Sequence, residues 1–173
     1  MTTAWPEPVE RVADFLRQAG AEARIEEFDE ETPTAADAAR AAGCSPEQIV
    51  KSVVVVADGV PVLALVPGDR RLNVRKVARA VGARKARIAS ADEVVEATGF
   101  VPGAVAPFPL PRVQRALCEQ SLLAQPLVWV GAGSTRHLAS LAPRELVRLA
   151  RAEPMDVVSE PTYDAPSPDQ GGS

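Results

Sequence analysis

The sequence predicts a single α+β domain, and three observations support this fold class. Helical and extended patterns alternate along the chain without the regular strand-helix-strand order of a doubly wound parallel sheet. The 173 residues are 46% hydrophobic but only 4% aromatic, so one core built mainly from Val, Leu and Ala is expected. Residues 159–173 are rich in Pro, Asp, Ser and Gly, which predicts a disordered tail after a folded domain of residues 1–158.

Helices are predicted where apolar residues recur at helical spacing between capping residues. The first contains Val9, Val12 and Leu16 on one face and ends at Gly20. Three more are expected between an N-terminal cap and a glycine, from Thr34 to Gly43, from Asn73 to Gly82 and from Ser90 to Gly99. The last helix begins at Pro143, because proline is favoured at the first helical position.

Strands are predicted at residues 24–28, 52–57, 62–66 and 127–130, the last followed by a loop over Gly131-Ala132-Gly133. The dipeptide Asp58-Gly59 is typical of a tight antiparallel hairpin between the second and third strands. Prolines at residues 108–111 argue against a central strand there, and residues 113–117 fit neither pattern clearly. The order of elements favours an α+β fold or a mixed, barrel-like sheet.

Composition and charge narrow the classes of function. The net charge of -4 argues against a protein that coats nucleic acid, yet residues 70–87 contain eight basic residues and no acidic one. This basic block is either a surface for a polyanion or a solvated helix face. Two cysteines are too few for a disulfide framework, so both are expected to be reduced. Without a signal peptide or a long apolar run, a cytoplasmic protein with no membrane partner is the default.

Several familiar chemistries are disfavoured. His137 is the only histidine, so a metal site with two or three histidine ligands is excluded, and neither a metal nor another cofactor is expected. A Ser-His-Asp triad would require His137, but the chain has no Gly-x-Ser-x-Gly elbow and Ser134 suits a turn equally well. The Gly131 loop lacks the third glycine of a dinucleotide-binding motif, because Arg136 takes its place.

Four features remain, namely Lys51, the Gly-rich turn with Gly103, the Gly131 to Gly133 loop and His137, and the first two are the most informative. Lys51 precedes a run of four valines, where its ammonium must reach solvent or meet an anionic or strongly polar partner such as a phosphate. The turn spans residues 101–107 and contains Gly103, where glycine allows a ligand to approach the backbone closely. The alternatives to a functional role are that Lys51 simply extends to solvent and that Gly103 is an ordinary turn glycine.

Six segments in order resemble the YbaK-type aminoacyl-tRNA deacylases, freestanding relatives of the editing domain inserted in bacterial prolyl-tRNA synthetases. They are Thr34 to Ala39, Ile49 to Ser52, Leu72 to Ala78, Thr98 to Phe100, Gly103 to Pro107 and Gly131 to Gly133. The resemblance covers about residues 25 to 157. It implies a mixed, mostly antiparallel and barrel-like central sheet surrounded by helices.

The resemblance also implies roles for individual residues. Lys51 would hold the 3′-terminal adenosine and its phosphate, and Gly103 would lie at the scissile ester. By its charge rather than by the resemblance, the basic block is a candidate for contact with tRNA phosphates, through Arg75, Lys76 and Arg79. The remaining substrate-binding residues would be Ser52, Ala104, Val105, Ala106, Pro107, Gly131, Gly133 and His137.

The function implied by the resemblance is hydrolysis, in trans, of tRNA mischarged with a small amino acid such as alanine, serine or cysteine. The partners would be the aminoacylated tRNA end and, as a second candidate, an aminoacyl-tRNA synthetase. Two departures leave alternatives open. Relatives often have an aspartate near residues 117–120, where Glu119 is the acidic residue here, and a glycine or serine at Ala104 and Ala106. A noncatalytic protein that binds tRNA ends or a partner, or a hydrolase of another phosphate-bearing ester, would fit as well.

Overall fold

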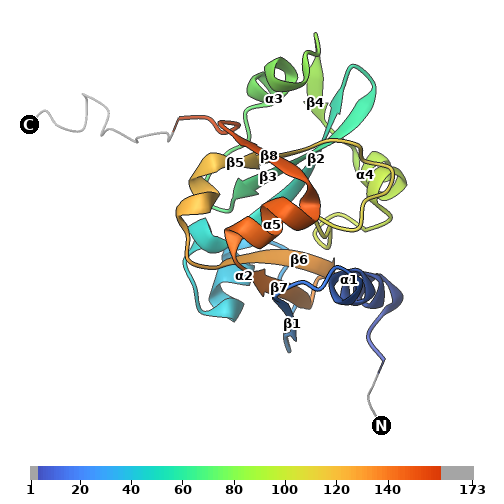
Figure 1. The fold of residues 1–173 in the computed structure, drawn as a ribbon, viewed down its shortest axis with the longest axis vertical. Helices are drawn as coiled ribbons and strands as arrows, with labels where there is room; N and C mark the ends of the chain where they lie inside the picture. The colour runs from blue at the N-terminus through green and yellow to red at the C-terminus, as the bar shows by residue number, and fades with distance from the viewer. Residues whose placement is uncertain (1–3, 161–173) are drawn as a thin grey trace, which may run out of the picture.

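The computed structural model describes residues 4–160, which form two sheets and five α-helices (Figure 1). The three-stranded sheet has the order β1-β7-β6, with β1 at Ala23–Glu27, β6 at Val128–Ser134 and β7 at His137–Leu141. The five-stranded sheet has the order β4-β2-β3-β5-β8. Its strands are β2 (Val50–Ala57), β3 (Val60–Pro67), β4 (Ala86–Ile88), β5 (Ala116–Glu119) and β8 (Ala152–Met155).

The pairing confirms a mixed, mostly antiparallel α+β fold. Within residues 4–160, four strand pairs are antiparallel, and two are parallel, β3 with β5 and β5 with β8. The β2–β3 hairpin turns at Asp58 and Gly59, both with positive φ, as the dipeptide predicted. The strands are divided between two sheets, which are joined by an isolated parallel bridge between Ile49 and Trp129.

The helices begin and end close to the predicted capping residues. They are α1 (Glu7–Gln18), α2 (Ala35–Ala42), α3 (Val74–Val81), α4 (Ala91–Thr98) and α5 (Pro143–Ala150). Side chains of Thr34, Asn73 and Ser90 accept hydrogen bonds from the first turns of α2, α3 and α4. Two short 3₁₀ helices, Pro46–Gln48 and Gln120–Ala124, complete the set.

One predicted boundary was wrong and three strands were not predicted. Strand β6 continues through Gly131-Ala132-Gly133 to Ser134, where a loop was expected, and a register shift between Gly131 and Ser134 accommodates the extra residues. Strands β4, β7 and β8 lie where no strand was predicted, and β5 begins inside the ambiguous segment. Most of the predicted disordered tail, residues 161–173, lies outside the described residues.

The main core lies between the two sheets and the helices α1 and α5. Its fully buried side chains include Val12, Leu65, Phe100, Phe108 and Leu146. In Figure 1 the three-stranded sheet lies below the five-stranded one, with α1 beside β6. None of the helices in residues 4–160 has the length and apolar character that crossing a membrane requires.

Candidate functional site

A cavity of about 220 Å³ opens where the two sheets meet, next to the Ile49–Trp129 bridge. Four segments that are distant in the sequence form its walls. These are the connection into α2, the start of β2, the loop after α4, and strands β6 and β7, which together contribute residues 32–35, 38, 49–52, 103, 105, 129, 131 and 138. Lys51 is the one ionisable side chain among these lining residues.

Lys51 lies at the start of β2, opposite Val66 of β3, and is half-buried. Its Nζ donates a hydrogen bond to the backbone carbonyl of Arg70 at 2.7 Å. Burial lowers the pKa of this ammonium, Asp69 opposes the shift and Arg71 adds to it. The lysine therefore holds a partly desolvated charge at the cavity, with the Arg70 carbonyl as its hydrogen-bond acceptor and the Asp69 carboxylate as an opposite charge nearby.

Ser52, the next residue of β2, also lines the cavity. Its Oγ is inaccessible to solvent and has no hydrogen-bond partner among residues 4–160, although the residue lines the cavity. A buried hydroxyl without a partner costs stability unless a ligand or water satisfies it. Ser52 therefore places an unsatisfied hydroxyl beside the cavity.

The Gly103 turn forms another part of the cavity wall. Gly103 has φ +86 and is exposed, and a Cβ built on it would lie 3.8 Å from the carbonyl oxygen of Pro33. Positive φ rather than crowding explains glycine at this position. Ala104 and Ala106, which follow, are buried, and the Ala104 carbonyl accepts a hydrogen bond from Gly133 N–H at 3.2 Å. The turn is thus anchored to strand β6.

Gly131 of β6 packs against this turn more closely than any side chain would allow. A Cβ at this position would lie 2.5 Å from the carbonyl oxygen of Val105, and real Cβ contacts are essentially never under 3.0 Å. Gly131 and Val105 both line the cavity. The absence of a side chain at residue 131 therefore sets the position of the turn relative to Lys51.

The structure brings five of the predicted site residues into one cavity: Lys51, Ser52, Gly103, Val105 and Gly131. The others lie outside its lining. Pro107 is buried and borders a separate cavity beside Phe15 and Phe108. Gly133 packs on the N-terminal end of α1, where a Cβ would lie 2.7 Å from the backbone of Pro8.

His137 faces away from the cavity. Leu138, the next residue of β7, lines the cavity, and successive side chains of a strand point to opposite faces. The His137 ring is buried, with Nδ1 bonded to the Ser134 hydroxyl and the ring edge-to-face with Trp5 at 5.6 Å between centroids. Its Nε2 lies 3.7 Å from a carboxylate oxygen of Glu27. Burial lowers the pKa of His137, and Glu27 opposes this shift.

Some residues of the basic block are exposed, and others form ion pairs within the protein. Arg75 and Arg79 are exposed on α3, as the predicted tRNA contact requires. Lys76 instead binds the segment after β8, with Nζ 2.8 Å from Asp156 Oδ2 and 2.7 Å from the Val158 carbonyl. Arg87 forms a bidentate pair with Glu93 of α4.

Sequence reasoning missed a second cavity that Lys51 also borders. Its volume is about 640 Å³, and its walls include Asp69, Arg70, Arg71 and Ser159. The loop after β3 has no motif of its own, and only the fold brings it beside Lys51.

Glu119, considered as a replacement for an aspartate of relatives, is buried and accepts hydrogen bonds from the N–H groups of Ser121 and Val157. No group of three or more His, Cys, Asp or Glu within residues 4–160 is arranged to hold a metal.

The chain is similar to known proteins over most of its length. The model of the family described as aminoacyl-tRNA editing domain matches residues 29–149. The chain is 36% identical over 123 residues to a proline–tRNA ligase of Bacillus licheniformis, covering 69% of this chain and 22% of the ligase. It is 34% identical over 132 residues to the ligase of Nitratidesulfovibrio vulgaris, covering 76% of this chain and 22% of the ligase. The chain thus spans about a fifth of the length of these ligases.

The fold agrees with this similarity. A crystal structure of a proposed trans-editing enzyme for prolyl tRNA synthetase superposes on the chain with a TM-score of 0.84 and 35% identity. The superposition covers 91% of this chain and 100% of that one. The chain therefore belongs to the aminoacyl-tRNA editing domain family, in the YbaK group related to the editing domain of prolyl-tRNA synthetase.

Proposed function

We propose that this protein is a trans-acting deacylase that hydrolyses the ester of a tRNA mischarged with a small amino acid. One observation carries the proposal beyond family membership: Lys51 and Gly103 lie in the lining of the same small cavity, with Gly131 beside them. A cation and an accessible backbone turn are the two features that an aminoacyl ester at a tRNA end requires. The lysine provides charge for the phosphate, and the turn allows close approach to the carbonyl.

The reaction requires a water molecule and no covalent intermediate. Water adds to the ester carbonyl, the carbon–oxygen bond to the ribose breaks, and the ribose oxygen takes a proton, which leaves a free amino acid and an intact tRNA. Among the lining residues only Lys51 is ionisable, so a general base from the protein is not at hand. A hydroxyl or side-chain group of the substrate is therefore the best candidate to activate the water.

The sizes of the two cavities suit the two parts of this substrate. A volume of about 220 Å³ is smaller than the range of ~300–1,000 Å³ for drug-sized ligands and fits a small aminoacyl group. The second cavity, about 640 Å³, has room for a nucleotide, and Lys51 stands between the two. Alanine, serine and cysteine are the proposed substrates because the apolar walls formed by Val105, Trp129 and Leu138 favour small side chains.

The direct test uses tRNAs charged with labelled alanine, serine or cysteine. Wild-type protein is expected to release the label, and Lys51→Ala to release it at least about 100-fold more slowly, the scale of losing a transition-state contact. Lys85→Ala is the matched control, because it removes the same charge from an exposed position on the edge of the sheet. Equal rates for the two variants would contradict the role of Lys51.

A second candidate function is binding of tRNA ends without hydrolysis. It is favoured by the same lining, which offers no acid or base other than Lys51, and by the engagement of Glu119 in backbone contacts. The label-release assay separates the two functions. Tight binding of every charged tRNA with no release above the uncatalysed rate would leave the binding protein as the better account.

A further inference from the structure

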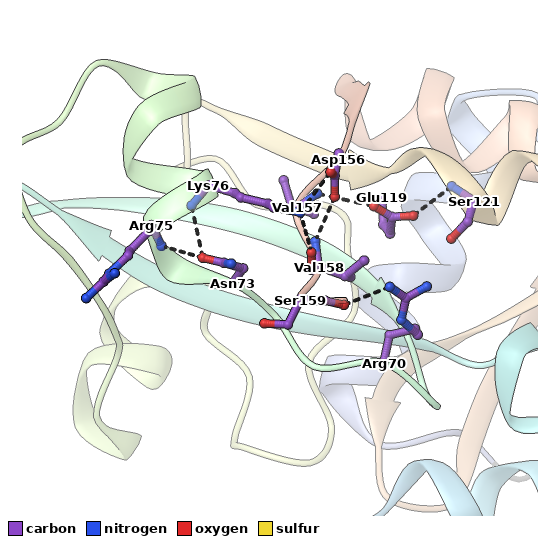
Figure 2. A network of polar contacts seen from close by, with 10 residues as sticks. All are labelled: Arg70, Asn73, Arg75, Lys76, Glu119, Ser121, Asp156, Val157, Val158 and Ser159. Atoms are coloured by element: carbon purple, nitrogen blue, oxygen red, sulfur yellow. Dashed lines mark hydrogen bonds and ion pairs between the residues drawn. The ribbon is translucent and has the colours of Figure 1, made fainter. Parts of the chain in front are cut away.

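A short segment after β8 crosses the loop that follows β3, and we name residues 156–159 the C-terminal strap (Figure 2). Its backbone is bonded to that loop at both ends. Asn73 N–H donates to the Val157 carbonyl at 2.8 Å, and Ser159 N–H donates to the Arg71 carbonyl at 2.9 Å. Leu72 and Val158 form an isolated antiparallel bridge between these bonds. The strap lies beyond residues 29–149, the part of the chain matched by the family model.

Charged side chains fix the strap from two directions. Lys76 of α3 binds Asp156 and the Val158 carbonyl, as described above. From the other side, Glu119 at the end of β5 accepts the Val157 N–H at 3.2 Å and is itself 3% exposed. Val157 and Val158 are buried in a hydrophobic cluster with Val66 of β3 and Val77 of α3. The strap is therefore a well-anchored part of the fold.

The last residue of the strap is connected to Lys51 through Arg70. The Arg70 guanidinium donates from Nη2 to the Ser159 carbonyl at 2.7 Å. The backbone carbonyl of Arg70 accepts the hydrogen bond from Lys51 Nζ, also at 2.7 Å. The Ser159 carbonyl thus accepts a hydrogen bond from the Arg70 side chain, and the Ser159 N–H donates one to the Arg71 carbonyl. The Arg70 carbonyl in turn accepts the hydrogen bond of Lys51.

We propose that the C-terminal strap positions the Lys51 ammonium, with Arg70 as the positioning residue that transmits the constraint. A lysine head group is a flexible point charge on a four-carbon stem, so one fixed acceptor decides where it lies. A displacement of about 1 Å in a reacting site costs on the order of 100-fold in rate. The effect on hydrolysis rests on the proposed function, whereas the effect on the lysine itself does not.

Lysine NMR tests the positioning without any tRNA. The sequence contains three lysines, Lys51, Lys76 and Lys85, so selective labelling gives three side-chain signals. In Arg70→Met, the Lys51 signal is expected to shift and its ammonium protons to exchange with water faster. The Lys76 signal shows whether the strap remains docked, and the exposed Lys85 serves as an internal control. An unchanged Lys51 signal in Arg70→Met overturns the proposal.

A matched pair at residue 159 tests the strap itself. Both bonds of Ser159 to the loop use its backbone, so Ser159→Ala keeps them, whereas Ser159→Pro removes the N–H that binds Arg71. Ser159→Pro is expected to change the Lys51 signal in the same direction as Arg70→Met, and Ser159→Ala to leave it as in the wild type. Equal signals from the two variants contradict a role for the strap.

A double-mutant cycle connects the position of Lys51 to the rate. Arg70→Met is expected to slow label release about tenfold or more in the wild-type background and to add little to Lys51→Ala. Additive losses would mean that Arg70 acts on the substrate by itself, which overturns its positioning role. If the NMR changes are present while even the wild type releases no label, the proposed function fails and the positioning of Lys51 stands.

Discussion

Gly131→Ala gives the sharpest prediction, because the structure specifies what the added methyl group would meet. Its Cβ would lie 2.5 Å from the Val105 carbonyl oxygen, and ordinary contact begins at 3.4 Å. Restoring that distance requires a shift of 3.4 − 2.5 = 0.9 Å between β6 and the Gly103 turn. Such a shift is expected to slow deacylation about 100-fold, because it moves a wall of the cavity that Lys51 also lines.

The same substitution also affects stability. Overpacking of a close contact costs about 1–3 kcal/mol in the free energy of unfolding, measured by urea denaturation. Gly20→Ala is a suitable control, because φ is +60 and a Cβ there meets nothing within 4 Å. It should cost about 1–2 kcal/mol through backbone strain alone and leave the rate unchanged, since Gly20 lies after α1 and away from the cavity.

The rate measurement decides between the two effects. Label release is measured below the melting temperatures of both variants, with excess enzyme, so that the chemical step is observed. A wild-type rate for Gly131→Ala would refute the argument that the position of the Gly103 turn controls the reaction. Loss of activity in Gly20→Ala to the same extent would show that general destabilisation, and not the cavity wall, explains the effect.

Two further predictions concern charge. Burial lowers the pKa of His137, so the unfolded chain binds a proton at a higher pH than the folded chain does, and the free energy of unfolding should fall as the pH decreases from about 7 to about 5. His137→Gln should flatten this dependence in urea denaturation, and an unaltered slope would mean that other groups cause it. Arg79→Met, on the exposed face of α3, should weaken tRNA binding uniformly and reduce the slope of log K against log salt by about 1. An unchanged slope in filter-binding titrations would remove Arg79 from the interface.

Features set by local chemistry could be predicted from the sequence. The caps Thr34, Asn73 and Ser90 and the turn at Asp58-Gly59 depend on neighbouring residues alone, and the structure has them as expected. Strands β7 and β8 could not be predicted, because their pairing partners, β1 and β5, lie far away in the sequence. The glycines of β6 suggested a loop, whereas close packing against the Gly103 turn and α1 explains them.

In the candidate site too, some features could be predicted from residue type, and others depend on contacts between distant segments. Lys51 and Gly103 were identified by residue type and by family resemblance, and both line one cavity. The orientation of His137 depends on the register of β7, which no local pattern indicates. The partner of Lys51 is a backbone carbonyl, and a backbone acceptor leaves no motif in the sequence by which this contact could be predicted.

The two sheets pair strands at very different separations along the chain, and this difference affects the order of folding. The β2–β3 hairpin joins neighbouring residues, whereas β1 pairs with β7 across more than a hundred residues, from Ala23 to Leu141. Pairings of such different contact order form on different timescales, because closing a long loop costs more entropy before any contact compensates. The hairpin carrying Lys51 is therefore expected to form early, and the binding cavity only when the distant strand completes the second sheet.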